Sequence, residues 1–237
     1  MYLVPLLATS MLLATAPQPA ADASFVVARF LKAYGGLERL RAFHSTRESG
    51  TIVRHRADGT RQGTVLLEES APNLSRLELT FGPDRTIKGF DGTTGWYLFP
   101  GENRPELADA AELKEMAANA FSHPLIDYAK RGMVVSLLTP GSVEGRPTYR
   151  LHVTRPDGSV WIIYIDSASF LEIRRDYITG GKITSVQHFR GHRVVNGVLR
   201  PTVYEHGPEG DLKSTVITLT RLEVDPDHPI SRFRPPS

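Results

Sequence analysis

The sequence predicts an α+β fold in which a long antiparallel β meander is the main element. From residue 47 onward, apolar and polar residues alternate with a period of two, which is typical of strands that bury one face. Turn-forming pairs such as Asp91-Gly92 and Asn196-Gly197 separate these runs at short intervals. Loops this short join antiparallel neighbours, because parallel strands need a long crossover. About 12 strand candidates result, which favours a barrel or a sandwich over an open flat sheet.

Two stretches depart from this pattern and predict helices. In residues 24–43 the apolar residues recur every three or four positions, and Gly35-Gly36 divides the stretch into two short helices. Residues 106–130 are rich in Ala, Glu and Lys with helical spacing, and Pro124 splits them into two further helices, placed between strands five and six. No linker or repeat divides the chain, so residues 24–237 are expected to form a single domain.

Residues 1–23 are predicted to be a secretory signal peptide. The first 16 residues are largely apolar and carry no charge, and Ala21-Asp22-Ala23 fits the small-x-small pattern of a signal peptidase site. No Lys or Arg precedes the apolar run, so either the true start lies upstream or the signal is a weak one. The alternative is a buried helix or strand at the amino end of the fold. We expect a soluble exported protein.

Composition excludes several classes of protein. The chain has no cysteine, which excludes disulfides, zinc ribbons, thiol nucleophiles and iron–sulfur clusters. Its 28 basic and 26 acidic residues give a net charge of +2 and are spread evenly along the chain. The clustered basic footprint of a nucleic-acid-binding protein is therefore missing. After the first 23 residues, no apolar run is long enough to span a bilayer.

The sequence contains no motif that predicts catalysis or metal binding. His188 and His192 are four apart, but on a strand this spacing separates them; His188 is expected to face solvent and His192 to lie in a turn. Glu68 and Glu69 are neighbours on a strand and should point to opposite faces, which defeats general acid–base pairing. No nucleophile elbow or phosphate-binding loop is present. We therefore expect no enzyme activity, no cofactor and no metal.

Some strands are apolar on both faces and must be covered on both sides. Residues 160–165 and 96–99 show no polar alternation. One interpretation is a core on one face and a packed helix on the other. The alternative is an apolar cavity on one face, with helices acting as a lid. The pattern by itself favours the first interpretation, because large pockets are few per protein.

A series of short motifs follows the order of these elements. They are Tyr34-Gly35-Gly36-Leu37-Glu38-Arg39-Leu40, Gly50-Thr51-Ile52, Phe90-Asp91-Gly92 with Gly95-Trp96, Pro124-Leu125-Ile126-Asp127-Tyr128, Tyr164-Ile165-Asp166 with Leu171 and Arg174-Arg175, Val194-Val195-Asn196-Gly197-Val198 with Pro201, and Pro229-Ile230 before Phe233. In these motifs and their order the chain resembles the outer-membrane lipoprotein-sorting protein group, the relatives of the periplasmic lipoprotein carriers. The resemblance covers nearly the whole chain after residue 23, and each motif is short.

The resemblance implies an incomplete, strongly curved antiparallel β-barrel of about 11 to 12 strands, with helices plugging its open side around an apolar cavity. With the resemblance, an apolar cavity is at least as well supported as a plain packed core. The candidate lining residues are Trp96, Leu98, Trp161 and Tyr164. The implied function is non-enzymatic periplasmic binding of a lipid or a lipoprotein acyl chain, with transport to the outer membrane and a membrane-bound partner protein. The alternative is a protein- or peptide-binding sensor module that uses the curved sheet or its edge. We expect a monomer.

Overall fold

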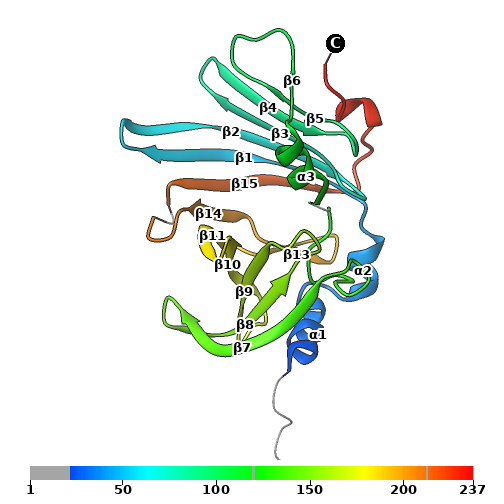
Figure 1. The fold of residues 1–237 in the computed structure, drawn as a ribbon, viewed down its shortest axis with the longest axis vertical. Helices are drawn as coiled ribbons and strands as arrows, with labels where there is room; N and C mark the ends of the chain where they lie inside the picture. The colour runs from blue at the N-terminus through cyan, green and yellow to red at the C-terminus, as the bar shows by residue number, and fades with distance from the viewer. Residues whose placement is uncertain (1–21, 119–120, 212, 237) are drawn as a thin grey trace, which may run out of the picture.

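The computed structural model describes residues 22–118, 121–211 and 213–236. The predicted signal peptide lies almost wholly outside these residues. An α+β fold is confirmed: one large antiparallel sheet curves around a small set of helices (Figure 1). Among the described residues, no helix is long and apolar enough to cross a membrane.

Over the described residues the sheet has 13 strands in the order β6-β5-β4-β3-β2-β1-β15-β14-β11-β10-β9-β8-β7, and it does not close. Its two edges are β6 and β7. Strands β12 and β13 form a separate two-stranded sheet. The strands are β1 (Ser45–Arg56), β2 (Gly59–Ser70), β3 (Leu74–Phe81), β4 (Asp84–Phe90), β5 (Gly95–Leu98), β6 (Glu106–Leu107), β7 (Val134–Val143), β8 (Arg146–Thr154), β9 (Val160–Asp166), β10 (Glu172–Thr179), β11 (Lys182–Arg190), β12 (Arg193–Val195), β13 (Val198–Arg200), β14 (Val203–Gly207) and β15 (Thr215–Val224).

The last long strand joins two meanders into one sheet. Strands β1 to β6 pair in sequence order on one side, and β7 to β11 with β14 pair on the other. Strand β15 lies between the two groups, antiparallel to both β1 and β14. For example, Thr46 of β1 pairs with Val224 of β15. The sheet is therefore continuous only because a carboxy-terminal strand is inserted beside the first strand.

The amino-terminal helices form as the sequence predicts. Helix α1 (Ala23–Ala33) is capped by Asp22, whose side chain accepts a hydrogen bond from the Phe25 amide at 2.7 Å. Gly35 then adopts a φ of 118°, and α2 (Leu37–Ala42) follows. A Cβ atom at Gly35 would collide with the carbonyl oxygen of Gly197 in the β12-β13 turn. Gly35-Gly36 therefore separates the two helices, and the missing side chain at Gly35 allows the β12-β13 turn to approach closely.

The helices fill one half of the concave face of the sheet, as Figure 1 shows for α1 and α2 beside β7 to β9. The fully buried Val26 and Phe30 of α1 pack against Leu151 of β8 and Ile163 of β9. These strand residues alternate with outward-facing ones, so the period-two pattern places the apolar face under the helices. The other half of the concave face is not filled in this way.

The carboxy-terminal segment covers part of the opposite, convex face. A short 3-10 helix, η1 (Ile230–Arg232), leads to Phe233, which is fully buried. The indole nitrogen of Trp96 donates to the Phe233 carbonyl at 2.7 Å. Arg232 contacts the fully buried carboxylate of Glu68 at 2.7 Å. The hydrogen bond from Trp96 holds the segment beside β5, where Figure 1 draws it in red, and the contact with Glu68 links it to β2.

Two expectations about local structure are wrong. Among the described residues of 106–130, only Ala110–Ala118 forms a helix, α3, and residues 124–132 form turns, because Asp127 adopts a left-handed φ of 52° that a helix does not allow. His188 does not face solvent: its exposure is 1%, because Arg190 and Glu144 cover it on the convex face.

Candidate functional site

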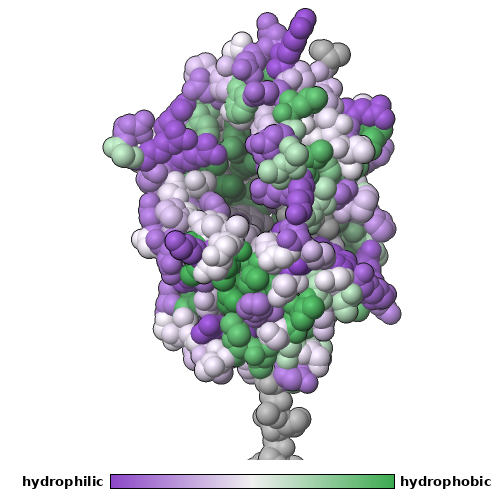
Figure 2. Space-filling model, viewed as in Figure 1, coloured by the Kyte–Doolittle hydropathy of each residue, from purple (hydrophilic) through white to green (hydrophobic). Residues whose placement is uncertain are grey.

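A cavity of about 1180 Å³ lies on the concave face, in the half that α1 and α2 leave open. Figure 2 shows the hollow in the middle of the molecule, green at its depth and largely purple at its rim. The lining residues come from both meanders of the sheet, from α3 and from residues 121–131. The cavity is thus a product of the whole fold.

One wall of the cavity is apolar. Strand β2 contributes Leu67 and the start of β3 contributes Leu74, while Leu77 of β3 is the direct cross-strand partner of Leu67. Phe121 and Phe189 add aromatic surface to the lining. Because side chains two apart on a strand share a face, alternation places Ser75 and Leu77 of β3 on the same face, whereas Leu74 belongs to the lining as the first residue of the strand.

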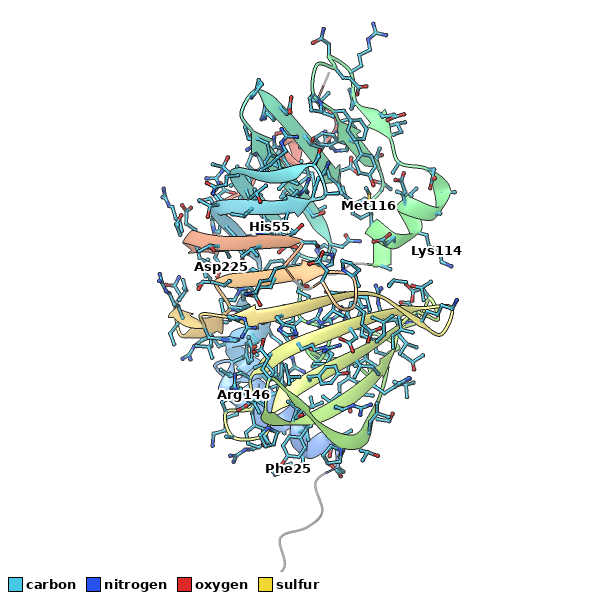
Figure 3. All side chains as sticks on the ribbon, turned by 90° about the vertical axis from the view of Figure 1, so that its left-hand side faces the viewer. Phe25, His55, Lys114, Met116, Arg146 and Asp225 are labelled. Carbon is cyan, nitrogen blue, oxygen red and sulfur yellow. The ribbon has the colours of Figure 1, made fainter. Side chains whose placement is uncertain are left out.

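Helix α3 lies at the rim of the cavity. Ala111, Lys114, Glu115 and Ala118 line the cavity and are spaced three and four apart, so they form one face of the helix. Figure 3 shows Met116 directed from α3 toward the sheet and Lys114 directed away from it.

Both halves of the molecule hold the end of α3. The Arg155 guanidinium donates to the Ala118 carbonyl at 2.6 Å, and the Asn73 amide donates to the Ala117 carbonyl at 3.4 Å. These side chains satisfy carbonyls that the end of a helix leaves free.

An ion pair on the floor of the cavity is set by a β-bulge. Arg175 and Glu172 of β10 are three apart and would point to opposite faces of a regular strand. A register shift between Glu172 and Arg174 turns both toward the cavity. Two nitrogens of Arg175 donate to the two oxygens of Glu172, each at 2.8 Å. Burial opposes ionisation of Glu172, but Arg175 and His123 outweigh it and lower its pKa to about 2.

His123 is anchored through both ring nitrogens. Its Nδ1 accepts from the Leu125 amide at 3.2 Å, so Nε2 carries the proton and donates to Glu172 at 2.8 Å. Burial lowers the pKa of His123, which keeps the ring neutral at neutral pH. The ring packs on Phe30 of α1, with centroids 4.6 Å apart. Because both of its ring nitrogens are hydrogen-bonded, His123 links helix α1 to Glu172 on the floor of the cavity. Neither nitrogen is placed to act as a general base.

A second group of charges lies where β1, β2 and β13 meet. Arg200 of β13 donates to the nearly fully buried Glu48 of β1 at 2.6 Å. Glu69 of β2 lines the cavity close to this pair. Burial, together with the charge of Glu48, raises the pKa of Glu69 to about 7.

Of the four lining residues expected from the sequence, Trp161 lines the cavity. Its ring packs under two guanidinium groups, with Arg155 at 4.4 Å and Arg175 at 5.0 Å from the ring centroid. It meets Tyr177 edge to face at 5.7 Å.

The other three expected residues are placed elsewhere. Tyr164 is three residues from Trp161 on β9, so it points to the convex face, where its hydroxyl donates to Asp176 at 2.8 Å. Trp96 is buried beneath the carboxy-terminal segment, and Leu98 lies two residues further along the same face of β5. The sequence does not reveal which face of a strand is concave, and it gave no signal for Leu67, Leu77 or Glu69 as lining residues.

Within residues 22–118, 121–211 and 213–236, no group of three or more His, Asp or Glu side chains is arranged to hold a metal ion. Glu68 and Glu69 do point to opposite faces: Glu68 contacts Arg47 and Arg232 on the convex side, while Glu69 lines the cavity.

No protein-family model and no curated protein matches the chain. Solved structures do. A DUF1329 family protein from Desulfovibrio piger has a TM-score of 0.61 at 13% identity, covering 90% of this chain and 97% of that one. A LolA superfamily protein from Nitrosomonas europaea has a TM-score of 0.60 at 13% identity, covering 91% and 98%. A structure described as an outer-membrane lipoprotein-sorting protein domain, from Vibrio parahaemolyticus, has a TM-score of 0.59 at 13% identity, covering 85% and 97%. The chain therefore has the fold of the LolA-superfamily and lipoprotein-sorting structures, as its sequence motifs predicted.

Proposed function

We propose that the protein is a non-enzymatic periplasmic binding protein that holds the apolar chain of a lipid or of a lipoprotein in the cavity on its concave face. The observation that carries the proposal is the cavity itself, about 1180 Å³ in volume with one wall made by Leu67, Leu74 and Leu77. Ligand pockets are typically about 300–1,000 Å³, so this space is ample for a long chain.

Physical chemistry supports such a ligand. Each methylene group transferred from water to an apolar wall is worth about 0.8 kcal/mol, so a long acyl chain supplies roughly 10 kcal/mol before ordering costs. A carrier needs no catalyst, and the two engaged nitrogens of His123 agree with a binding role. The likeness in fold to lipoprotein-sorting structures supports the same class of ligand.

Binding of a neutral, apolar fluorescent probe such as N-phenyl-1-naphthylamine tests the proposal. Uncharged alcohols of increasing chain length should displace the probe, each added methylene tightening binding roughly fourfold until the cavity is full. Leu77→Asp should abolish binding, because a carboxylate on the apolar wall would lose hydration when a chain enters. Tyr164→Phe, on the convex face, should bind the probe like the wild type.

Each variant is also melted, because a substitution that unfolds the protein would abolish binding for another reason. Wild-type protein that melts cooperatively yet binds neither probe nor alcohol at any pH would contradict the proposal. A protein- or peptide-binding module would then be the remaining function.

Export to the periplasm, with removal of residues 1–23, is tested by the intact mass of the protein from a periplasmic fraction. Cleavage after Ala23 would also remove the Asp22 cap from α1, so the first turn of the mature helix should exchange its amide protons faster than in the full chain. A full-length mass in that fraction would contradict this part of the proposal.

A further inference from the structure

Glu69 is an acid among apolar residues on the cavity wall. It lies two residues from Leu67 on β2, and the two side chains share the concave face. Its cross-strand partners are Thr46 of β1 and Ser75 of β3, neither of which carries a charge. The carboxyl group is therefore part of the same wall as the leucines that would contact an apolar chain.

The nearest cation is already engaged. Arg200 is bound to Glu48 at 2.6 Å, and this pair is the charged group that acts on Glu69 from β1 and β13. Across the described residues, Glu69 makes no side-chain hydrogen bond or ion pair. Arg200 lowers the pKa of Glu69 in turn, but burial and the charge of Glu48 outweigh it.

Other titratable groups also line the cavity. Tyr204 of β14, Lys88 of β4, and Lys114 with Glu115 of α3 are among them, and the rest are Tyr34, His123, Arg131, Arg155, Asp157, Glu172, Arg175, Tyr177 and His206. Lys88 lies over the ring of Tyr97, with its nitrogen 5.5 Å from the centroid, and Lys114 and Glu115 are exposed at the rim. None of them is an ion-pair partner of Glu69 among the described residues.

Burial and the neighbouring Glu48 raise the pKa of Glu69 to about 7, and Arg200 offsets only part of this rise. An apolar chain in the cavity would separate the carboxyl group from solvent. The ionised form of Glu69 would then lose its hydration without gaining a partner, whereas the protonated form would lose far less.

We propose that Glu69 couples occupancy of the cavity to proton uptake, so that a neutral apolar chain binds when Glu69 is protonated and is released when Glu69 ionises. This inference rests on the proposed binding function and adds to it a condition for loading and release. It also predicts that the cavity disfavours ligands whose buried end is anionic, because two negative charges would then meet away from water.

The pH dependence follows from linkage. The free protein holds the Glu69 proton below about pH 7, so the affinity for an uncharged ligand should be nearly constant below about pH 6. Above about pH 7 each bound ligand must take up a proton, and the affinity should fall by up to tenfold per pH unit.

The test uses hexadecanol as ligand and N-phenyl-1-naphthylamine as probe, since both are uncharged throughout the range. Dissociation constants are measured from about pH 5.5 to about pH 8.5 for the wild type, Glu69→Gln and Glu209→Gln. Glu69→Gln should bind with the same affinity at every pH. Glu209→Gln is the control, because Glu209 is an acid in an exposed loop away from the cavity lining, and it should keep the wild-type profile.

A second measurement needs no variant. Calorimetric titration of the wild type in buffers of different ionisation enthalpy reports the protons taken up per ligand. We expect about one proton near pH 8.5 and almost none near pH 5.5. Binding that persists with no proton uptake near pH 8.5 would overturn the coupling and leave the binding function standing. Absence of binding at every pH would instead remove the binding function itself.

Discussion

Replacing Glu172 with Gln should remove a pH-dependent part of the stability of this fold. Glu172 is 2% exposed and receives two bonds from Arg175 and one from His123. Its pKa falls from an ordinary 4.5 to about 2. At about 1.4 kcal/mol per unit, this shift contributes about 3 kcal/mol to the free energy of unfolding.

The sign of the effect is fixed by the direction of the shift. Because the folded pKa of Glu172 lies below the unfolded one, its contribution is fully present above about pH 5 and is lost as the pH falls toward 2. By about pH 3 the wild type should have lost about 2 kcal/mol relative to Glu172→Gln, which does not titrate.

Urea unfolding followed by circular dichroism, between about pH 7 and pH 3, measures this difference. Glu209→Gln, in an exposed loop, is the control and should run parallel to the wild type. A difference between wild type and Glu172→Gln that stays constant with pH would refute the reasoning, since it would mean that the ion pair does not favour the charged form of Glu172.

Three further predictions concern the convex face. Gly89→Ala should destabilise the protein by about 1–3 kcal/mol in urea unfolding, because the added methyl group would overlap the indole of Trp96; an unchanged midpoint would argue against that packing. His188→Ala should cost about 1–3 kcal/mol by the same assay, since it leaves a hole beneath Arg190, whereas a solvated histidine would cost almost nothing. Phe233→Ala should cost about 3–5 kcal/mol and shift Trp96 emission to the red, measured with Trp161 replaced by Phe; an unshifted spectrum would show that the segment does not cover Trp96.

The fold was largely predictable because its signals are local. Alternation of period two identified the strands, Gly35-Gly36 divided the first helical stretch, and pairs such as Asn196-Gly197 marked hairpin turns. The count of strands was low because short strands such as β6 and β12 lack enough residues to show a period.

The site was less predictable because it depends on long-range geometry. Alternation shows that Trp161 and Tyr164 face opposite sides but not which side is concave. The bulge that turns Glu172 and Arg175 to one face has no signature in the sequence. The covering of Trp96 depends on a segment more than a hundred residues away, with a separation of 137 between Trp96 and Phe233.

The cavity can form only after β15 has been synthesised, because β15 joins the two groups of strands that line it. Among the residues that the structure describes, no strand other than β15 bridges the β1–β6 meander and the β7–β14 group, and β15 is made after both. Contacts this distant in sequence form slowly, because a long loop must close before they are gained. A chain that still lacks β15 would have two separate curved sheets and no shared cavity. The cavity would therefore form in the final step of folding, and on the proposed binding function a chain truncated before Thr215 should retain strand signal in circular dichroism yet hold no probe.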